Sequence, residues 1–290
     1  MDWTAAGISS INLDSFLRGL PYSLSIIFII TFHEFGHYFA ARYHKVDATL
    51  PYYIPFPPIP GFLNFGTMGA VIRTRSAIQN NKAMFDIGVA GPIAGFIASL
   101  IVLIIGYSFL PSIDYLLNIH PDYFSPDYGK NYINLEFGNT LLFSFFREIF
   151  SQPGQFIPPM SEIYHYPYLC VGWFGLLITA MNLLPVGQLD GGHIIYSMFG
   201  QKKQEIISTI TMIGLVLLSV TGFIDMYLGL NLNIGWPGWI IWALLLYFVI
   251  KIKHPLIANF NPLDKKRQTV GYFAIIIFIL SFSPMPFNIW

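Results

Sequence analysis

Apolar segments long enough to cross a lipid bilayer are the feature that most limits what this chain can fold into. They cover residues 18–41, 84–110, 166–184, 206–224, 236–250 and 270–284. A helix needs about 20 apolar residues to cross the hydrocarbon core. Only 10% of the residues are charged, against about a quarter in a soluble domain. The sequence therefore predicts an all-α polytopic membrane protein with about six transmembrane helices.

The number of spans is open between five and seven. Pro185 interrupts the third apolar segment, and the last two segments are short. No internal repeat is visible, and residues 1–290 are predicted to form one membrane-embedded domain, with a core over 18–200 and C-terminal spans over 206–290. The start of the chain lacks a basic region, so we expect the first apolar segment to be retained as a span.

Lysine and arginine are concentrated in alternate loops. They follow the first, third and fifth apolar segments: Arg42, Lys45, Arg73, Arg75, Lys82, Lys202, Lys203, Lys251, Lys253, Lys265, Lys266 and Arg267. The long loop between the second and third segments is acidic and has only Lys130 and Arg147 as basic residues. Because loops rich in lysine and arginine stay in the cytoplasm, we expect both termini outside and the basic loops inside.

Charge and cysteine content exclude some classes of function. The 15 lysines and arginines balance the 15 aspartates and glutamates, so nothing indicates a nucleic-acid partner. The single cysteine, Cys170, excludes an internal disulfide and a cysteine-based metal cluster. Its apolar surroundings predict a packing role.

Three loop segments carry their own structural signals. Residues 51–60 contain five prolines and are predicted to be extended. Residues 61–75 indicate a short β-hairpin or edge strand in the loop after the first span. Residues 138–150 predict an amphipathic helix on or in the membrane surface, with a solvated loop helix as the alternative.

The motif His33-Glu34-Phe35-Gly36-His37 carries the sharpest chemical signal. On a helix, residues i and i+4 share one face, so both imidazoles can reach one metal ion. Glu34 stands where it can take a proton from water at that metal. Ionisable groups in an apolar span are costly unless they are paired or bind a metal. The motif therefore predicts a metal site; satisfied core histidines, or a metal site without hydrolysis, are the alternatives.

A tetrahedral catalytic zinc needs a third protein ligand besides two histidines. Asp190 is the best candidate, because Pro185 and Gly187 interrupt the helix before it and can turn its carboxylate inward. By the orientation derived from charge, the motif and Asp190 lie at similar depth, near the cytoplasmic side. His193 is a rival ligand, and Asp86 is expected at an interface or a helix start.

These motifs together resemble the site-2 protease family of intramembrane zinc metalloproteases, in its bacterial and plastid-type branch without a PDZ domain. The resemblance is carried by residues 33–37, by the glycine-rich block at 88–95 and by residues 182–192 with their Leu-Asp-Gly core. It implies one Zn²⁺ ion held by His33, His37 and Asp190. It also implies that Glu34 activates water and that Asn182 assists at the scissile carbonyl.

The resemblance implies a zinc-dependent endopeptidase that cleaves transmembrane segments of other membrane proteins. The expected partners are the lipid bilayer and a membrane-protein substrate with a transmembrane helix; no oligomeric state is implied. The expected location is a bacterial inner membrane, with the active site toward the cytoplasmic side. A metal-binding transporter and a catalytically inactive family member are the alternatives.

Two further expectations concern how the substrate and water reach the site. An edge strand within residues 66–75 is a candidate to hold the unwound substrate by backbone pairing. Gly36, Gly187, Gly191 and Gly192 leave room for a water path, with helix packing as an equal alternative.

Overall fold

The computed structural model describes residues 13–55, 67–78, 80–129, 134–151, 154–230 and 232–289. Its elements, in chain order, are α1 (Leu13–Tyr43), β1 (Tyr52–Pro55), β2 (Thr67–Val71), α2 (Asn81–Ser108), α3 (Ile113–Ile119), β3 (Leu135–Phe137), α4 (Leu141–Phe150), η2 (Ile163–His165), α5 (Pro167–Asn182), α6 (Asp190–Phe199), α7 (Gln201–Leu228), α8 (Trp239–Leu245), η3 (Leu246–Ile250), α9 (Lys265–Ser281) and β4 (Phe287–Ile289). The expectations for the chain start and for residues 56–66 lie outside the described residues.

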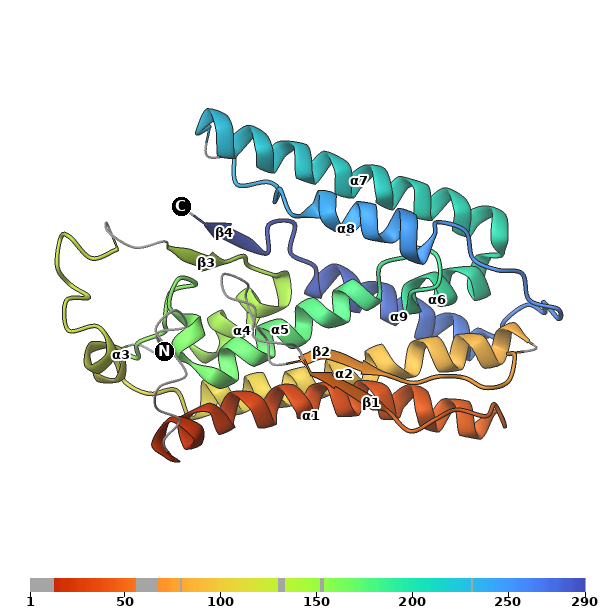
Figure 1. Cartoon of the computed structure of the whole chain (residues 1–290), viewed down its shortest axis with the longest axis horizontal. Helices are drawn as coiled ribbons and strands as arrows, with labels where there is room; N and C mark the ends of the chain where they lie inside the picture. The colour runs from red at the N-terminus through yellow and green to blue at the C-terminus, as the bar shows by residue number, and fades with distance from the viewer. Residues whose placement is uncertain are drawn as a thin grey trace.

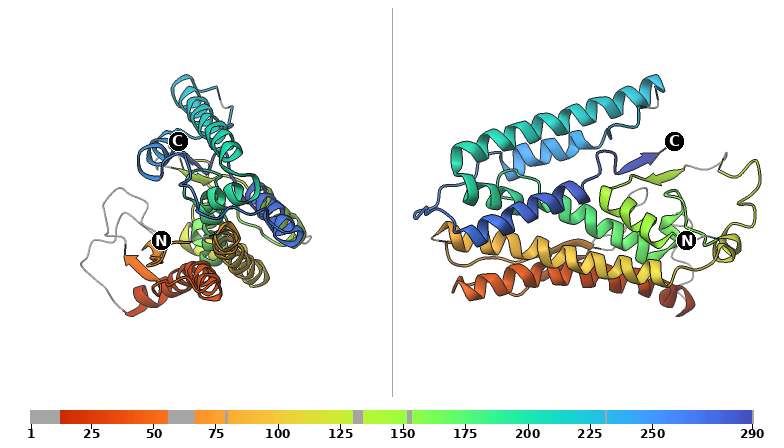
Figure 2. Two further views of the ribbon diagram at one scale, coloured as in Figure 1. Left: turned by 90° about the vertical axis from the view of Figure 1, so that its right-hand side faces the viewer. Right: turned by 180° about the vertical axis from the view of Figure 1, so that it is seen from behind.

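The long helices run along the long axis of the molecule and alternate in direction (Figure 1). α1, α2 and α5 pack against one another, and α7 packs with α8 on the other side of the molecule (Figures 1 and 2). The end of α1, the junction of α6 with α7 and the loop between η3 and α9 lie at one end, and α3 lies at the other. The basic loops therefore share one end of the molecule, which the orientation predicted from charge requires.

Three helices are long and apolar enough to cross a bilayer: Phe16–Tyr43, Asn81–Ser108 and Gln201–Leu228. The other apolar helices are shorter, because α5 has 16 residues, α9 has 17 and the pair α8–η3 covers Trp239–Ile250. All six predicted apolar segments are thus largely helical. A helical membrane protein is confirmed, but the predicted count of about six spans is not.

The surface of α1 and α7 is apolar where these helices have no helical neighbour. Phe39 is 64% exposed and Leu217 is 60% exposed. A continuous apolar surface of this kind is costly in water and stable in lipid. It supports the membrane location inferred from composition.

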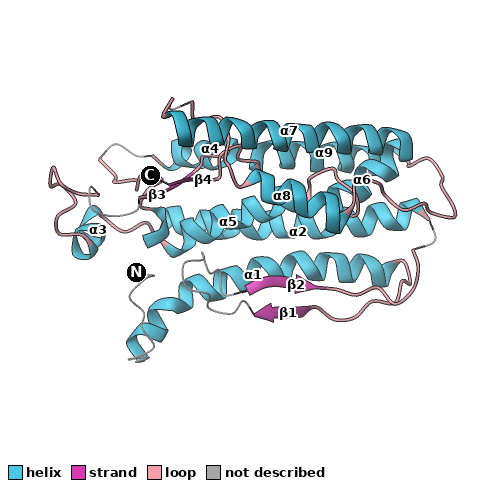
Figure 3. Ribbon diagram, turned by 45° about the horizontal axis from the view of Figure 1, so that its top comes forward, coloured by secondary structure: helices cyan, strands magenta, loops and turns pink. Residues whose placement is uncertain are grey.

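β1 and β2 form the hairpin that the sequence predicted after the first span (Figure 3). They pair antiparallel, with Tyr52 opposite Val71 and Tyr53 opposite Ala70. The first strand covers the described part of the proline-rich segment and lies before residues 61–75, where the hairpin was predicted; only the second strand falls within that range. The Tyr53 hydroxyl lies 2.7 Å from Thr31 Oγ1 on α1. This hydrogen bond ties the hairpin to α1 two residues before His33.

The helix break predicted before Asp190 is present between α5 and α6. Asn182 ends α5, and Asp190 begins α6. Gly187 in the connecting loop has φ +52°, and the Lys251 carbonyl fills the space where a side chain would start. Ser208 of α7 donates a hydrogen bond of 2.6 Å to the Pro185 carbonyl. The loop is therefore fixed on both sides and holds Asp190 in the first turn of a new helix.

Two elements of the outer loop complete the fold. α4 is present within the segment predicted as amphipathic, and the Thr140 side chain caps it by accepting from the Phe143 N–H. β3 pairs antiparallel with β4 near the C-terminus, a sheet that the sequence did not predict. Whether α4 lies on the membrane surface stays a prediction.

Candidate metal centre

α1 places His33 and His37 on one face, one turn apart, as the motif spacing requires. Their Nε2 atoms are 3.1 Å apart. The Oδ2 atom of Asp190 lies 3.5 Å from His33 Nε2 and 3.3 Å from His37 Nε2. The structure therefore brings together the three side chains that were predicted as metal ligands.

The spacing of these three atoms fits a zinc ion. Tetrahedral zinc with bonds of about 2.0–2.1 Å separates its donors by roughly 3.3–3.4 Å. The observed distances of 3.1, 3.3 and 3.5 Å lie around that value. Two imidazoles and one carboxylate leave the fourth position for water or substrate, as catalytic zinc sites do. The three donor atoms are therefore spaced as a tetrahedral zinc ion requires.

A backbone carbonyl orients the second histidine. His37 Nδ1 lies 2.7 Å from the Ile87 carbonyl oxygen, a position in which Nδ1–H donates. This leaves the Nε2 lone pair free to face the metal, which is the usual arrangement of a metal-ligating histidine. His33 is held mainly by packing, since it is only 7% exposed.

The glycine-rich block of α2 forms the wall behind both imidazoles. A side-chain carbon on Gly91 would overlap the His37 ring, and one on Gly95 would lie 3.0 Å from His33 Nδ1. From the other side, Gly36 of α1 packs on the Ala90 carbonyl. The absence of side chains at these positions is therefore what lets α1 and α2 approach with the histidines between them.

The four glycines considered for a water path are closely packed. Backbone carbonyls stand where a side chain would begin: Ala90 at Gly36, Lys251 at Gly187, Leu183 at Gly191 and Gly187 at Gly192. These contacts favour the packing alternative. At Gly191 and Gly192, they hold the first turn of α6 against the loop that precedes it.

The two candidate catalytic side chains lie beside His33. Glu34 follows it in α1 and is partly buried. Asn182, the last residue of α5, has its Nδ2 atom 3.5 Å from His33 Nε2. An acid and an amide donor therefore adjoin the cluster, one through the chain and the other through space.

His193, the rival ligand, has a different partner. Its Nδ1 atom lies 2.7 Å from His254 Nε2, 61 residues further along the chain. The His254 ring stacks on Tyr196, with ring centroids 4.1 Å apart. Within the described ranges, the donor cluster at this centre consists of His33, His37 and Asp190. Sequence reasoning missed His254, because no spacing or motif connects it with His193.

Asp86 takes part in an ion-pair network at the end of the bundle where the basic loops lie. Its carboxylate accepts from Arg267 Nε at 2.8 Å and Nη2 at 2.6 Å, and it lies 2.7 Å from His44 Nε2. These contacts join α1, α2 and α9. The expected interfacial role agrees with this arrangement.

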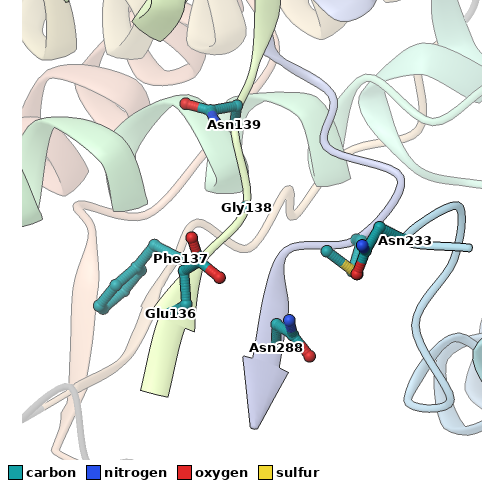
Figure 4. Close-up of a pocket in the computed structure, with 7 residues that line it drawn as sticks. Glu136, Phe137, Gly138, Asn139, Asn233 and Asn288 are labelled. Carbon is teal, nitrogen blue, oxygen red and sulfur yellow. The ribbon is translucent and has the colours of Figure 1, made fainter. Parts of the chain in front are cut away.

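A separate pocket lies at the β3–β4 sheet (Figure 4). It is lined by Glu136, Phe137, Gly138, Asn139, Asn233, Met285 and Asn288. None of its lining residues belongs to the metal centre.

A helical membrane protein that carries an H-E-x-x-H helix belongs, by fold and motif, to the class of membrane metallopeptidases. The chain is a member of peptidase family M50, whose model matches residues 21–221. This confirms the resemblance to the site-2 proteases.

The relatives that the chain matches are named as probable zinc metalloproteases. The chain is 27% identical over 277 residues to the probable chloroplastic zinc metalloprotease EGY2 of Oryza sativa subsp. indica, covering 95% of this chain and 44% of that protein. It is 26% identical over 272 residues to the probable chloroplastic zinc metalloprotease EGY1 of Arabidopsis thaliana, covering 92% and 43%. The chain thus spans less than half the length of these relatives. No solved structure matches it.

These comparisons bear on the predicted cofactor and location. The family and the names of the relatives support zinc, but not a count of ions. The apolar helices and the family support a membrane protein. Because the relatives are chloroplastic, they give no support to the expected bacterial inner membrane.

Proposed function

We propose that the protein is a zinc-dependent intramembrane endopeptidase that cleaves transmembrane segments of other membrane proteins. One observation carries this proposal: two imidazoles and a carboxylate, with donor atoms 3.1–3.5 Å apart, inside a bundle of apolar helices. The ligands proposed for one catalytic ion are His33, His37 and Asp190.

Each neighbouring side chain has a role in the proposed reaction. A bound zinc ion would supply Lewis acidity toward water and toward the substrate carbonyl. Glu34 accepts a proton from the attacking water and passes it to the leaving amine as general base and then general acid. Asn182 is within reach of the same position and donates its amide N–H to the carbonyl oxygen, a contact that is worth about 3–4 kcal/mol in comparable sites.

The β1–β2 hairpin is proposed to hold the substrate. A transmembrane helix hides its carbonyls in its own hydrogen bonds, so the segment to be cut must unwind. β2 pairs antiparallel with β1 in a two-stranded sheet. An extended peptide can bind to a small sheet by adding a strand, and the Tyr53–Thr31 hydrogen bond keeps the hairpin near the proposed zinc ligands.

We also propose that all six apolar helices cross the membrane. Those shorter than 18 residues can do so where the bilayer thins or neighbouring helices cover their ends. The helices outside the zinc centre would serve as scaffold and as a lateral gate for substrate entry. The basic loops would lie on the cytoplasmic side.

Two other functions fit the sequence less well. A transporter usually has polar groups on several spans and internal repeats, whereas among the apolar helices that the structure describes, the candidate metal ligands lie on α1 and at the start of α6. A catalytically inactive family member would not need the intact Glu34.

A cleavage assay with single-span membrane proteins tests the proposed function. Purified wild-type protein and Glu34→Gln are reconstituted with the same panel, and zinc is measured in both. We expect the wild type to produce fragments, and Glu34→Gln to produce none while it retains its zinc. Equal amounts of product from both proteins would rule out the role of Glu34, and no product from the wild type on any substrate would favour a non-hydrolytic function.

A further inference from the structure

A second cluster of metal-binding side chains lies in the segment between α2 and α5. It consists of His120, which follows α3, and of Glu162 and His165, which lie at η2. His120 Nε2 lies 2.9 Å from His165 Nε2, and His165 Nε2 lies 3.6 Å from Glu162 Oε2. The three donor atoms all lie within 4.8 Å of one another. Their spacing resembles that of the catalytic cluster.

The side chains of this cluster are largely buried and are held by hydrogen bonds from neighbouring residues. Glu162 is 4% exposed and His165 is 5% exposed, while His120 is half-buried. The Tyr128 hydroxyl donates to Glu162 Oε1 at 3.0 Å, and Ser161 Oγ lies 3.5 Å from the same atom. The Tyr115 hydroxyl donates to the His165 carbonyl at 2.8 Å. Neighbouring side chains therefore hold both the carboxylate and the turn that carries His165.

One carboxylate oxygen of this cluster lacks a hydrogen bond from the described part of the chain. Glu162 Oε2 is buried and has no hydrogen-bond partner among the residues that the structure describes. A buried, unsatisfied carboxylate oxygen is costly. A hydrogen bond between the two Nε2 atoms would use one imidazole lone pair, yet it would leave Glu162 Oε2 unsatisfied. A cation bound by all three side chains satisfies every one of these atoms.

The chemistry of the donors indicates which cation fits. Two imidazole nitrogens and one carboxylate oxygen are a donor set that zinc accepts, and calcium or magnesium would need more oxygen ligands.

We propose that His120, Glu162 and His165 form a second zinc site, outside the catalytic centre. The ion would tie the end of α3 to the turn that leads into α5, and so fix the long loop between α2 and α5. This role is structural and doesn't depend on the proposed protease activity.

Zinc stoichiometry of the full-length protein in detergent tests the second site. The protein is stripped with a chelator, dialysed against Zn²⁺ and analysed for zinc per chain. His33→Ala/His37→Ala removes the catalytic ligands, and we expect this variant to hold one zinc where the wild type holds two. Adding His120→Ala/His165→Ala should remove the remaining ion, while adding Asp114→Ala, a change at an exposed residue of α3, should leave it.

Two outcomes would overturn the second site: no zinc in His33→Ala/His37→Ala, or zinc that persists after His120→Ala/His165→Ala. A wild type whose zinc content is unaffected by His33→Ala/His37→Ala would instead contradict the catalytic centre, so the two failures are distinguishable.

A milder variant guards against misfolding. In the His33→Ala/His37→Ala protein, Glu162→Gln keeps the size of the side chain and an oxygen that can accept from Tyr128, but it removes the charge. We expect the midpoint of thermal unfolding without zinc to stay the same and zinc affinity to fall at least tenfold. Unchanged affinity would contradict the proposed ligand.

Discussion

Gly91 and Gly95 control where the imidazoles of His37 and His33, the proposed zinc ligands, can lie. Each stands directly behind one imidazole ring, so a methyl group at Gly91 would occupy the space of the His37 ring. His37 is also bound through Nδ1 to the Ile87 carbonyl, and a shifted ring would lose this hydrogen bond. Ligand geometry thus depends on residues that make no bond to the metal.

Gly91→Ala is expected to weaken zinc binding at the catalytic centre at least tenfold and to reduce cleavage by a similar factor, because the new methyl group displaces His37. The measurements are zinc affinity and the initial rate of cleavage. Gly214→Ala in α7 is the matched control, since among the described residues no atom beyond its own stretch of helix lies within 4 Å of the added carbon. Normal zinc affinity in Gly91→Ala would show that the His37 imidazole can move without weakening zinc binding.

Two elements lie next to the candidate metal centre and position its surroundings. They are the β1–β2 hairpin and the break between α5 and α6. The hairpin is tied to α1 at Thr31, and the break starts α6 at Asp190. Both features lie next to the helix that carries the two histidines. We therefore expect mutations in the hairpin to affect the proposed substrate binding and not metal binding.

Val71→Pro in β2 is expected to lower the cleavage rate at least tenfold without changing the zinc content. Proline removes a backbone N–H from the strand and disturbs its extended pairing. Val71→Thr keeps the N–H and the β-branched shape, so its rate should match that of the wild type. Cleavage by Val71→Pro at the wild-type rate would mean that the hairpin does not hold the substrate.

The sequence predicts local features of these elements well and distant contacts poorly. Apolar length located each long helix, and Pro185 with Gly187 located the break before Asp190, because these signals lie within the segment itself. The pairing of His193 with His254 and the cluster of His120 with His165 depend on residues 61 and 45 positions apart. No periodicity or motif reports such contacts, so only the fold reveals them.

The whole molecule is held together at its basic end by the network around Asp86. The carboxylate joins Arg267 of α9 to His44 at the end of α1, and the groups are mostly shielded, with side-chain exposures of 17–28%. The Arg267 guanidinium also pairs with Asp264. This network links the first two helices, which carry and enclose the zinc histidines, to the last one.

Asp86→Asn is expected to lower the free energy of unfolding by about 1.5–3 kcal/mol, the usual worth of a hydrogen bond to a charged group. Asparagine has only one acceptor oxygen in its side chain, so it cannot replace all the contacts that the carboxylate makes with Arg267 and His44. The Arg267 guanidinium also loses its negatively charged partner. Thermal unfolding in detergent measures the effect. Glu205→Gln is the control, because its pair with Lys253, whose side chain is 74% exposed, is worth little. If Asp86→Asn and Glu205→Gln had the same free energy of unfolding, the Asp86 network would not stabilise the fold as predicted.

The account depends most on three side chains from α1 and α6 holding one catalytic zinc ion. The zinc content of Asp190→Ala, measured beside Asp114→Ala as a control on an exposed aspartate, tests this directly. We predict that Asp190→Ala holds one zinc ion fewer per chain than the wild type and produces no fragments, while Asp114→Ala behaves as the wild type. A full complement of zinc in Asp190→Ala would contradict the central claim.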